Sequence, residues 1–256
     1  QWLISLGRFD IFTATMTLSR FRAVPRIGHV ERAKRIYGYL YKFKDAAIRY
    51  RTALPDMSEY PLKHYDWSRT VYGNVKEVLP NDAPGPLGKS ITLRTYVDAN
   101  LMHDMVTGRA VTGVLHMING TCIDWYSKRQ ATVETATFGA EFVACRIAVD
   151  QITDLRHTLR YLVVPVDSPS YLFGDNQSVV KNGTLPFSTI NKRHNILSYH
   201  RVRESIAAGI VNFHWIDGKT NPADVLSKHW AYTDAKQHLI PLLFCRYDVK
   251  PQKKQE

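Results

Sequence analysis

The order of hydrophobic patterns after residue 90 restricts the fold of this chain most. Residues 91–98 alternate apolar and polar side chains, and two further strand-like stretches flank Asn119-Gly120, a strong hairpin signal. The patterns that follow predict a helix over 139–162, a strand over 170–174, helices over 176–181 and 194–208, a strand over 210–216, and a helix opened by Asn221-Pro222. This order predicts an α/β fold, a mixed sheet with helices on both faces.

The chain before residue 90 has a different character. Residues 1–54 are basic and predict two helices and a short strand, while residues 55–90 hold five prolines and no periodicity, as in a linker. Aromatic residues in this linker, Trp67 among them, are able to pin it to a neighbouring surface. After a sheet domain over 91–232, we expect a basic tail over 233–256.

Charge and composition narrow the classes of function. The chain of 256 residues has 34 Lys and Arg against 23 Asp and Glu, and a net charge of +11 indicates a polyanionic partner, nucleic acid before membrane. No apolar run is long enough to cross a membrane. Three cysteines without a CxxC pair argue against a zinc site and a disulfide scaffold, and favour a reducing, intracellular location. The first residues do not form a signal peptide, and we expect the C-terminal piece of a longer protein.

Four acidic residues fall at the ends of predicted elements. Asp98 ends or interrupts the first strand, Asp175 follows a buried strand, and the predicted last helix carries Asp224 in its first turn. Glu141 shares the inward stripe of the long helix. Buried carboxylates repel one another unless a cation meets them, and hard oxygen ligands suit Mg²⁺ or Mn²⁺. Two such ions are able to promote hydrolysis of a phosphodiester.

Each acid also has an ordinary structural explanation. Asp175 could cap the helix that follows it, and Asp224 could be a first-turn acid favoured by the helix dipole. Asp98 could form an Asx-turn. Glu141 is hardest to explain in this way, because its neighbours on the same face are Ala and Cys. The joint placement of the four acids therefore carries the metal hypothesis.

Residues 91 to about 231 resemble the ribonuclease H domain of Ty1/copia-type retrotransposon reverse transcriptases. The resemblance rests on YVDAN (96–100), the hairpin stretch 107–133, GAEFVA (139–144), GDNQSVV (174–180), KRHNILSYHRVRE (192–204) and NPADVLSK (221–228). It implies a ribonuclease H-like mixed five-stranded sheet preceded by a small, mainly helical thumb or connection segment at 1–54. It also implies that Asp98, Glu141, Asp175 and Asp224 are the catalytic, metal-binding acids, holding two Mg²⁺ or Mn²⁺ ions.

The function implied by the resemblance is metal-dependent hydrolysis of the RNA strand of RNA–DNA hybrids during reverse transcription. The partners would then be a hybrid or template–primer and the upstream palm and fingers of the same polyprotein, with no membrane, in the cytoplasm (virus-like particles) or the nucleus. One alternative is a catalytically silent nucleic-acid-binding remnant of a copia-type element. Another is a nuclease of the same fold, such as an integrase core.

Basic and polar residues near the acids are candidates for contact with nucleic acid. Such contacts would go to 2′-hydroxyls on one strand and phosphates on the other. The candidates are Asn176, Gln177, Ser178, Lys128, Arg129, Arg193, His200 and Arg201.

The sequence departs from the family at two places that bear on activity. A Glu common two residues before the catalytic Glu is Gly139 here, and the loop before the last predicted helix lacks the His found in many ribonucleases H. Ala99 follows Asp98, where a polymerase YxDD box would need a second acid, so we expect no polymerase activity from this chain alone.

Overall fold

A computed structural model describes residues 1–190 and 193–244 of the chain. Its elements, in chain order, are α1 (Trp2–Ser5), η1 (Phe9–Ile11), α2 (Phe12–Ser19), α3 (Ile27–Lys42), β1 (Ala47–Ile48), β2 (Leu93–Asp104), β3 (Arg109–Ile118), β4 (Thr121–Arg129), α4 (Thr137–Tyr161), β5 (Ser170–Gly174), α5 (Gln177–Thr184), η2 (Arg193–Asn195), α6 (Ile196–Ala207), β6 (Val211–Trp215), η3 (Gly218–Thr220), α7 (Asp224–Ser227), α8 (Tyr232–Leu239) and β7 (Leu243–Phe244). None of the helices in this part of the chain is both long and apolar enough to span a membrane.

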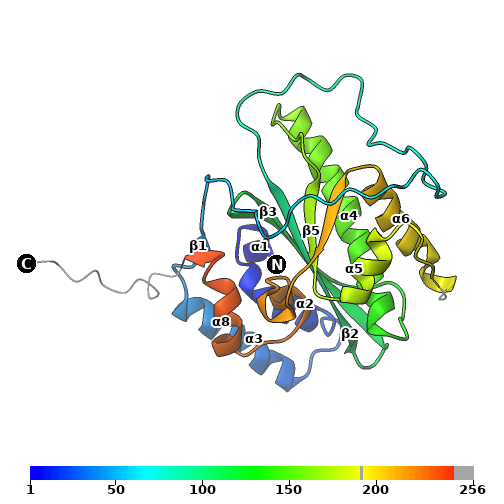
Figure 1. Cartoon of the computed structure of the whole chain (residues 1–256). Helices are drawn as coiled ribbons and strands as arrows, with labels where there is room; N and C mark the ends of the chain where they lie inside the picture. Colours follow the sequence, from blue (N-terminus) through cyan, green and yellow to red (C-terminus); the bar gives the residue numbers. More distant parts are fainter. Residues whose placement is uncertain (191–192, 245–256) are drawn as a thin grey trace, which may run out of the picture.

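Five strands form a mixed sheet in the middle of the molecule (Figure 1). Their order is β4-β3-β2-β5-β6. β2, β3 and β4 are antiparallel neighbours, and β5 and β6 run parallel to β2. The β3–β4 turn contains Asn119 with φ of 52°, the left-handed conformation that this hairpin signal predicts. The predicted fold class, a mixed five-stranded sheet with helices on both faces, is confirmed.

The first strand of the sheet is longer than the alternation at 91–98 predicted. β2 continues to Asp104, with an irregularity in its pairing to β3 between Asn100 and Asp104. Asp98 therefore lies inside the strand, not at its end or in an Asx-turn. The apolar-polar alternation ends early because both faces of the sheet are covered at this level, so Val97, Asp98 and Ala99 are all buried.

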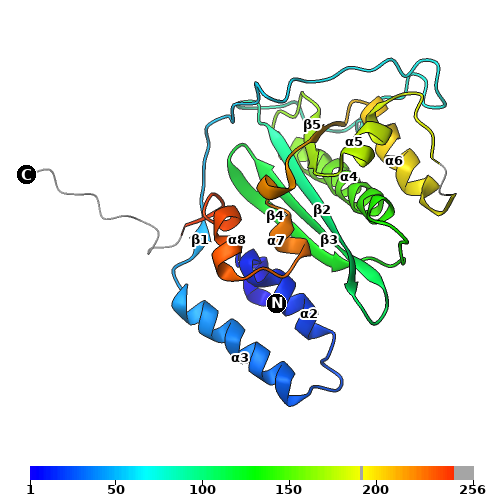
Figure 2. The same ribbon diagram turned by 60° about the horizontal axis from the view of Figure 1, so that its bottom comes forward.

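Helices cover both faces of the sheet (Figure 2). α4 lies along one face with α5 and α6, and its side chains join Val97 and Leu172 in the larger apolar core. The short α7 packs against β2 and β3 on the other face, where Leu226 joins Leu115 and Phe9 in a second core. α2 also reaches α7, while α3 lies outside α2 and buries none of its residues.

Residues 55–90, here called the strap, contain no helix or strand but cross the sheet domain (Figure 1). The Trp67 side chain is buried in the larger core, and the Asn212 side chain on β6 exchanges two hydrogen bonds with the backbone of Lys63. Glu77 accepts four hydrogen bonds of 2.7–2.9 Å from the guanidinium groups of Arg156 and Arg160 on α4. The strap is thus held on the domain by a buried aromatic ring, by hydrogen bonds to Asn212 and by a buried ion-pair cluster.

The end of the chain differs from the predicted basic tail. Residues 232–239 form α8, and β7 pairs antiparallel with β1 of the N-terminal segment. The Ala235 and Leu239 side chains join the second core, which stabilises α8 even though its sequence shows little apolar periodicity. Residues 245–256, with the KPQKK stretch, lie outside the described residues. The domain boundaries deduced from the sequence stay predictions.

Candidate active site

Three carboxylates converge beside the middle of β2. Asp98 belongs to β2, Glu141 to the second turn of α4, and Asp175 follows the last residue of β5. Because Tyr96 of β2 is paired with Phe173 of the parallel strand β5, residues 98 and 175 lie at the same level of the sheet. One carboxylate oxygen from each of the three acids lies within 4.8 Å of the others.

The end of β5 explains why the site lies at this level. β5 stops at Gly174, which leaves β2 without a neighbouring strand on that side from Asp98 onward. The Ala99 backbone N–H beside this gap lowers the pKa of Glu141, although burial outweighs it. This is the general position of sites in open α/β sheets, at the carboxyl end of a strand where the pairing changes.

Burial and mutual repulsion shift the protonation of these acids. Burial, followed by the charges of Asp98 and Asp175, raises the pKa of Glu141 well above its ordinary value. Burial and the Asp98 charge likewise raise the pKa of Asp175. The cluster therefore holds more negative charge than its own surroundings neutralise, a condition that a bound cation relieves.

Asp224 lies on α7 and reaches the same cluster through a lysine. Lys228 Nζ lies 2.8 Å from Asp224 Oδ1 and 3.3 Å from Asp98 Oδ1, and the Ser227 hydroxyl donates to Asp98. Burial, then the Asp98 charge, raises the pKa of Asp224 to about 7. Burial alone would lower the pKa of Lys228, but the Asp98 and Asp224 carboxylates raise it, so the lysine stays protonated.

A glycine on β3 sets how closely α7 approaches the sheet. Gly113 is the partner of Asp98 across the β2–β3 ladder. A Cβ atom at this position would lie 2.7 Å from the Ala223 carbonyl oxygen and 3.0 Å from two Leu226 atoms. The absence of a side chain at 113 therefore allows α7 to bring Asp224 against Asp98.

We expect Gly113→Ala to push α7 away from the sheet. The added methyl group meets backbone that is packed on both sides, so the variant should lose about 1–3 kcal/mol of unfolding free energy, measured by urea titration. Gly85→Ala is a suitable comparison, because Gly85 is exposed and a Cβ there would meet nothing within 4 Å. Equal stability of Gly113→Ala and the parent chain would contradict this account of α7 packing.

The chemistry of the donor set fits a hard divalent cation. Within the described part of the chain, the group of side chains close enough to share an ion consists of carboxylates alone: Asp98, Glu141 and Asp175. All-oxygen donors suit Mg²⁺ or Mn²⁺ and not zinc. Asp224 is the fourth carboxylate at the same place, paired with Lys228.

Of the eight residues predicted to contact nucleic acid, four are exposed and four already have partners within the protein. Lys128, Gln177, Ser178 and Arg193 are exposed, whereas Asn176 caps α5 by accepting from the Ser178 and Val179 backbone N–H groups. Arg129 is paired with Asp104, Arg201 with Asp150 and Glu204, and His200 forms a 2.6 Å hydrogen bond with Tyr72 of the strap. The paired residues are held by the protein itself, because their charges or ring nitrogens already have partners.

Two residues of the site, Lys228 and Glu134, were missed from the sequence. Lys228 follows Asp224 by four residues, a spacing that places two helical side chains on one face and that was a usable signal. Gly139 stands where the family has a Glu, and a Cβ there would lie 2.5 Å from Glu134 Oε2 and 2.4 Å from Asn195 Nδ2. The Glu134 carboxylate, from the loop before α4, therefore fills the space beside residue 139.

Two proteins with similar sequences place the chain among known relatives. The "Retrovirus-related Pol polyprotein from transposon TNT 1-94" of Nicotiana tabacum is 27% identical over 141 residues, 55% of this chain. The chain resembles one segment of a retrotransposon Pol polyprotein. It spans 10% of that relative's length. A second relative, "Secreted RxLR effector protein 161" of Plasmopara viticola, is 24% identical over 151 residues, 59% of this chain and 82% of the relative.

No family model matches the chain. Among solved structures, the N-terminal RNase H domain of a Mycobacterium tuberculosis protein gives a TM-score of 0.43 at 13% identity, covering 59% of this chain and 98% of that one. RNase H1 from Halobacterium salinarum gives 0.41 at 18% identity, covering 57% and 98%. LC11-RNase H1 in complex with an RNA/DNA hybrid gives 0.43 at 16% identity, covering 53% and 94%.

Proposed function

We propose that this chain is a metal-dependent ribonuclease H, which hydrolyses the RNA strand of RNA–DNA hybrids as part of a retrotransposon reverse transcriptase. The observation that carries the proposal is the convergence of Asp98, Glu141 and Asp175 within 4.8 Å, with Asp224 linked to them through Lys228. The similarity to a retrotransposon Pol polyprotein supports the same biological setting. In that setting residues 1–54 would be the thumb or connection segment, and the palm and fingers would lie upstream.

The four acids would hold two Mg²⁺ or Mn²⁺ ions. When bound, such ions supply a water-derived nucleophile and stabilise the leaving oxygen of a phosphodiester. The protein's own part is to keep the carboxylates in place: the Ser227 hydroxyl donates a hydrogen bond to Asp98, and Lys228 contacts both Asp98 and Asp224. The positive charge of Lys228 lies between Asp98 and Asp224 and reduces the repulsion between their carboxylates. The two acids are therefore able to lie close together.

The substrate would lie over the exposed residues beside Asp175. Gln177 and Ser178 are exposed directly after it and have donors for sugar or phosphate oxygens. Lys128 and Arg193 are exposed cations able to contact phosphates. We include these four as proposed contacts and leave Arg129 and Arg201 as ion-pair partners of Asp104 and Asp150.

The test is a cleavage assay with three labelled substrates of one sequence: an RNA–DNA hybrid, an RNA duplex and a DNA duplex. We expect Mg²⁺-dependent cleavage of the RNA strand of the hybrid alone, abolished by EDTA. Equal cleavage of the DNA duplex would favour a nuclease of the integrase type. Tight binding of the hybrid without cleavage would favour a catalytically silent binding module.

A further inference from the structure

The four acids of the candidate site lie on four separate segments, and each segment has to be held in place. Asp98 lies in β2, which is paired with β3, and Asp175 directly follows β5, which is paired with β2 and β6. Backbone ladders therefore fix the positions of these two acids. Asp224 and Glu141 lie on α7 and α4, and the place of a helix on a sheet depends on side-chain contacts.

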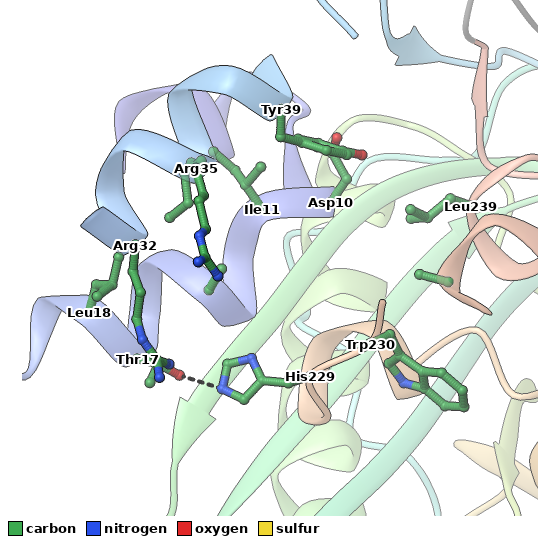
Figure 3. Close-up of a pocket in the computed structure, with 13 residues that line it drawn as sticks. Asp10, Ile11, Thr17, Leu18, Arg32, Arg35, Tyr39, His229, Trp230 and Leu239 are labelled. Atoms are coloured by element: carbon green, nitrogen blue, oxygen red, sulfur yellow. Dashed lines mark hydrogen bonds between the residues drawn. The ribbon is translucent and has the colours of Figure 1, made fainter. Parts of the chain in front are cut away.

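α7 is held from the side of the N-terminal segment. The Thr13 hydroxyl of α2 donates a 2.8 Å hydrogen bond to a backbone carbonyl oxygen of α7. One turn further along α2, Thr17 forms a 3.2 Å hydrogen bond with His229, just beyond α7 (Figure 3). His229 lines a groove beside Arg32 and Arg35 of α3 (Figure 3). Contacts with α2 thus fix α7 together with its carboxylate.

The start of α4 lacks local support. Its N-cap residue, Ala136, makes no side-chain hydrogen bond, and its first turn contains no acidic residue. Glu141 lies one turn further on. A helix start without a cap depends on tertiary contacts for its position. The position of the Glu141 carboxylate is therefore set by side chains from other segments.

Gln130, the residue directly after β4, links this part of α4 to the sheet. Its side-chain Nε2 donates a 2.8 Å hydrogen bond to the Ala140 backbone carbonyl oxygen and a 3.0 Å hydrogen bond to Thr112 Oγ1. The buried Oε1 atom has no hydrogen-bond partner within residues 1–190 and 193–244, and such burial costs stability. Gln130 therefore contributes through its two N–H donors more than through packing.

The two acceptors of Gln130 are immediate neighbours of two of the acids. Ala140 directly precedes Glu141 on α4. Thr112 of β3 is paired across the β2–β3 ladder with Ala99, which directly follows Asp98. A single side-chain amide thus joins the level of Asp98 in the sheet to the helical turn of Glu141.

We propose that Gln130 is a positioning residue for the metal centre, whose two hydrogen bonds hold the start of α4 where Glu141 meets Asp98 and Asp175. The proposal rests on the proposed function in taking these carboxylates as metal ligands. Their oxygens lie within 4.8 Å of one another, and Mg²⁺ demands near-ideal ligand geometry, so a small shift of α4 would weaken the site.

Gln151 provides a matched comparison on the same helix and the same strand. Its side-chain Oε1 lies 3.2 Å from Nε2 of His116, and His116 belongs to β3, as Thr112 does. Gln151 lies about 15 Å beyond Glu141 along α4, at the helical rise of about 1.5 Å per residue. Both glutamines therefore link α4 to β3, but only Gln130 does so beside the acids.

The test measures the affinity of the full chain for Mn²⁺, with free Mn²⁺ followed by electron paramagnetic resonance. Methionine keeps the approximate size of glutamine and removes its amide. Gln130→Met should raise the Mn²⁺ dissociation constant by about 10–100-fold, the usual effect of losing a residue that orients metal ligands. Gln151→Met should change it by less than about threefold. A purely structural role predicts equal dissociation constants for the folded variants, whatever their melting temperatures.

A milder variant covers the case in which Gln130→Met fails to fold. Thr112→Val keeps the shape of the side chain and removes one of the two acceptors, so it should raise the dissociation constant by about threefold or more. The double variant Gln130→Met/Thr112→Val should bind Mn²⁺ no more weakly than Gln130→Met, because Thr112 acts through Gln130. An unchanged dissociation constant in Thr112→Val, with Gln130→Met unfolded, would overturn the proposal.

The positioning role and the ribonuclease activity fail in different ways. A loss of Mn²⁺ affinity confined to the variants at 130 and 112 supports the role of Gln130 even if the hybrid is never cleaved, a result that would refute the ribonuclease activity alone. Equal dissociation constants for Gln130→Met and Gln151→Met overturn the positioning role even if cleavage is normal. Absence of Mn²⁺ binding by the parent chain overturns both proposals.

Discussion

Replacement of Asp175 by Asn should lower the rate of hybrid cleavage by at least about 100-fold. Loss of a residue that merely orients a metal ligand commonly costs 10–100-fold, and Asp175 is proposed as a ligand itself. The amide keeps the size of the side chain but removes one of the three charges that meet within 4.8 Å. Cleavage rates at saturating Mg²⁺ measure the effect. Asp154→Asn is the matched control, because Asp154 is exposed on α4.

The same variant has a signature that does not depend on activity. Without divalent ions, Asp175→Asn should be more stable than the parent, because one charge fewer repels Asp98 and Glu141. Added Mg²⁺ or Mn²⁺ should stabilise the parent by about 2.7 kcal/mol when the ion concentration is 100 times the dissociation constant. The melting temperature of the parent should therefore rise with added ion, and that of the variant should rise much less. A variant that is stabilised by the ions as strongly as the parent would remove Asp175 from the metal site.

Replacement of Glu77 by Ala should destabilise the fold by about 3–5 kcal/mol. The substitution leaves the Arg156 guanidinium, which is 2% exposed, without its carboxylate partner, and an uncompensated buried charge carries a penalty of this size. For a chain of this length the melting temperature should fall by about 10 °C. Glu59→Ala removes a charge from an exposed position of the same strap and should change stability by less than about 0.5 kcal/mol.

Glu77 also gives the strap a defined pH dependence. Although burial opposes ionisation, hydrogen bonds and charges from Arg156 and Arg160 lower the pKa of Glu77 from 4.5 to about 2. Because the folded-state pKa is lowered, the stability contributed by this group is fully present above pH 4.5 and is lost as the pH falls toward 2. Urea titrations from pH 6 to pH 2 should show that the parent loses its advantage over Glu77→Gln in this window. Parallel pH profiles would refute the ion-pair account.

The sequence predicted the sheet well because its signals are local. The alternation after residue 90, the Asn119-Gly120 turn and the long helical stripe each depend on near neighbours in the chain. Asp175 after a buried strand and Glu141 on an inward stripe were identified for the same reason. The extension of β2 past Asp98 was missed, because burial on both faces removes the alternation that marks a strand.

Other parts of the molecule depended on contacts between distant segments. α8 and the β1–β7 pair are stabilised by packing between the two ends of the described chain, for which neither segment has a strong pattern of its own. Arg129 and Arg201 looked like free cations in the sequence, yet Asp104 and Asp150 pair with them in the fold. The groove beside Arg32 and Arg35 exists only because α3 and residues 229–230, nearly 200 positions apart, meet at α2.

By itself, the sequence determined the chemistry that is available: a basic chain with four acids, each next to a local signal for the end or the inward face of an element. Only the tertiary structure decided how these acids meet. Parallel pairing puts Asp98 level with Asp175, and Gly113 allows α7 to bring Asp224 and Lys228 against them. The reason is physical: local periodicity fixes which face a side chain takes, whereas the distance between two charges depends on strand register and close packing of segments that are remote in the chain.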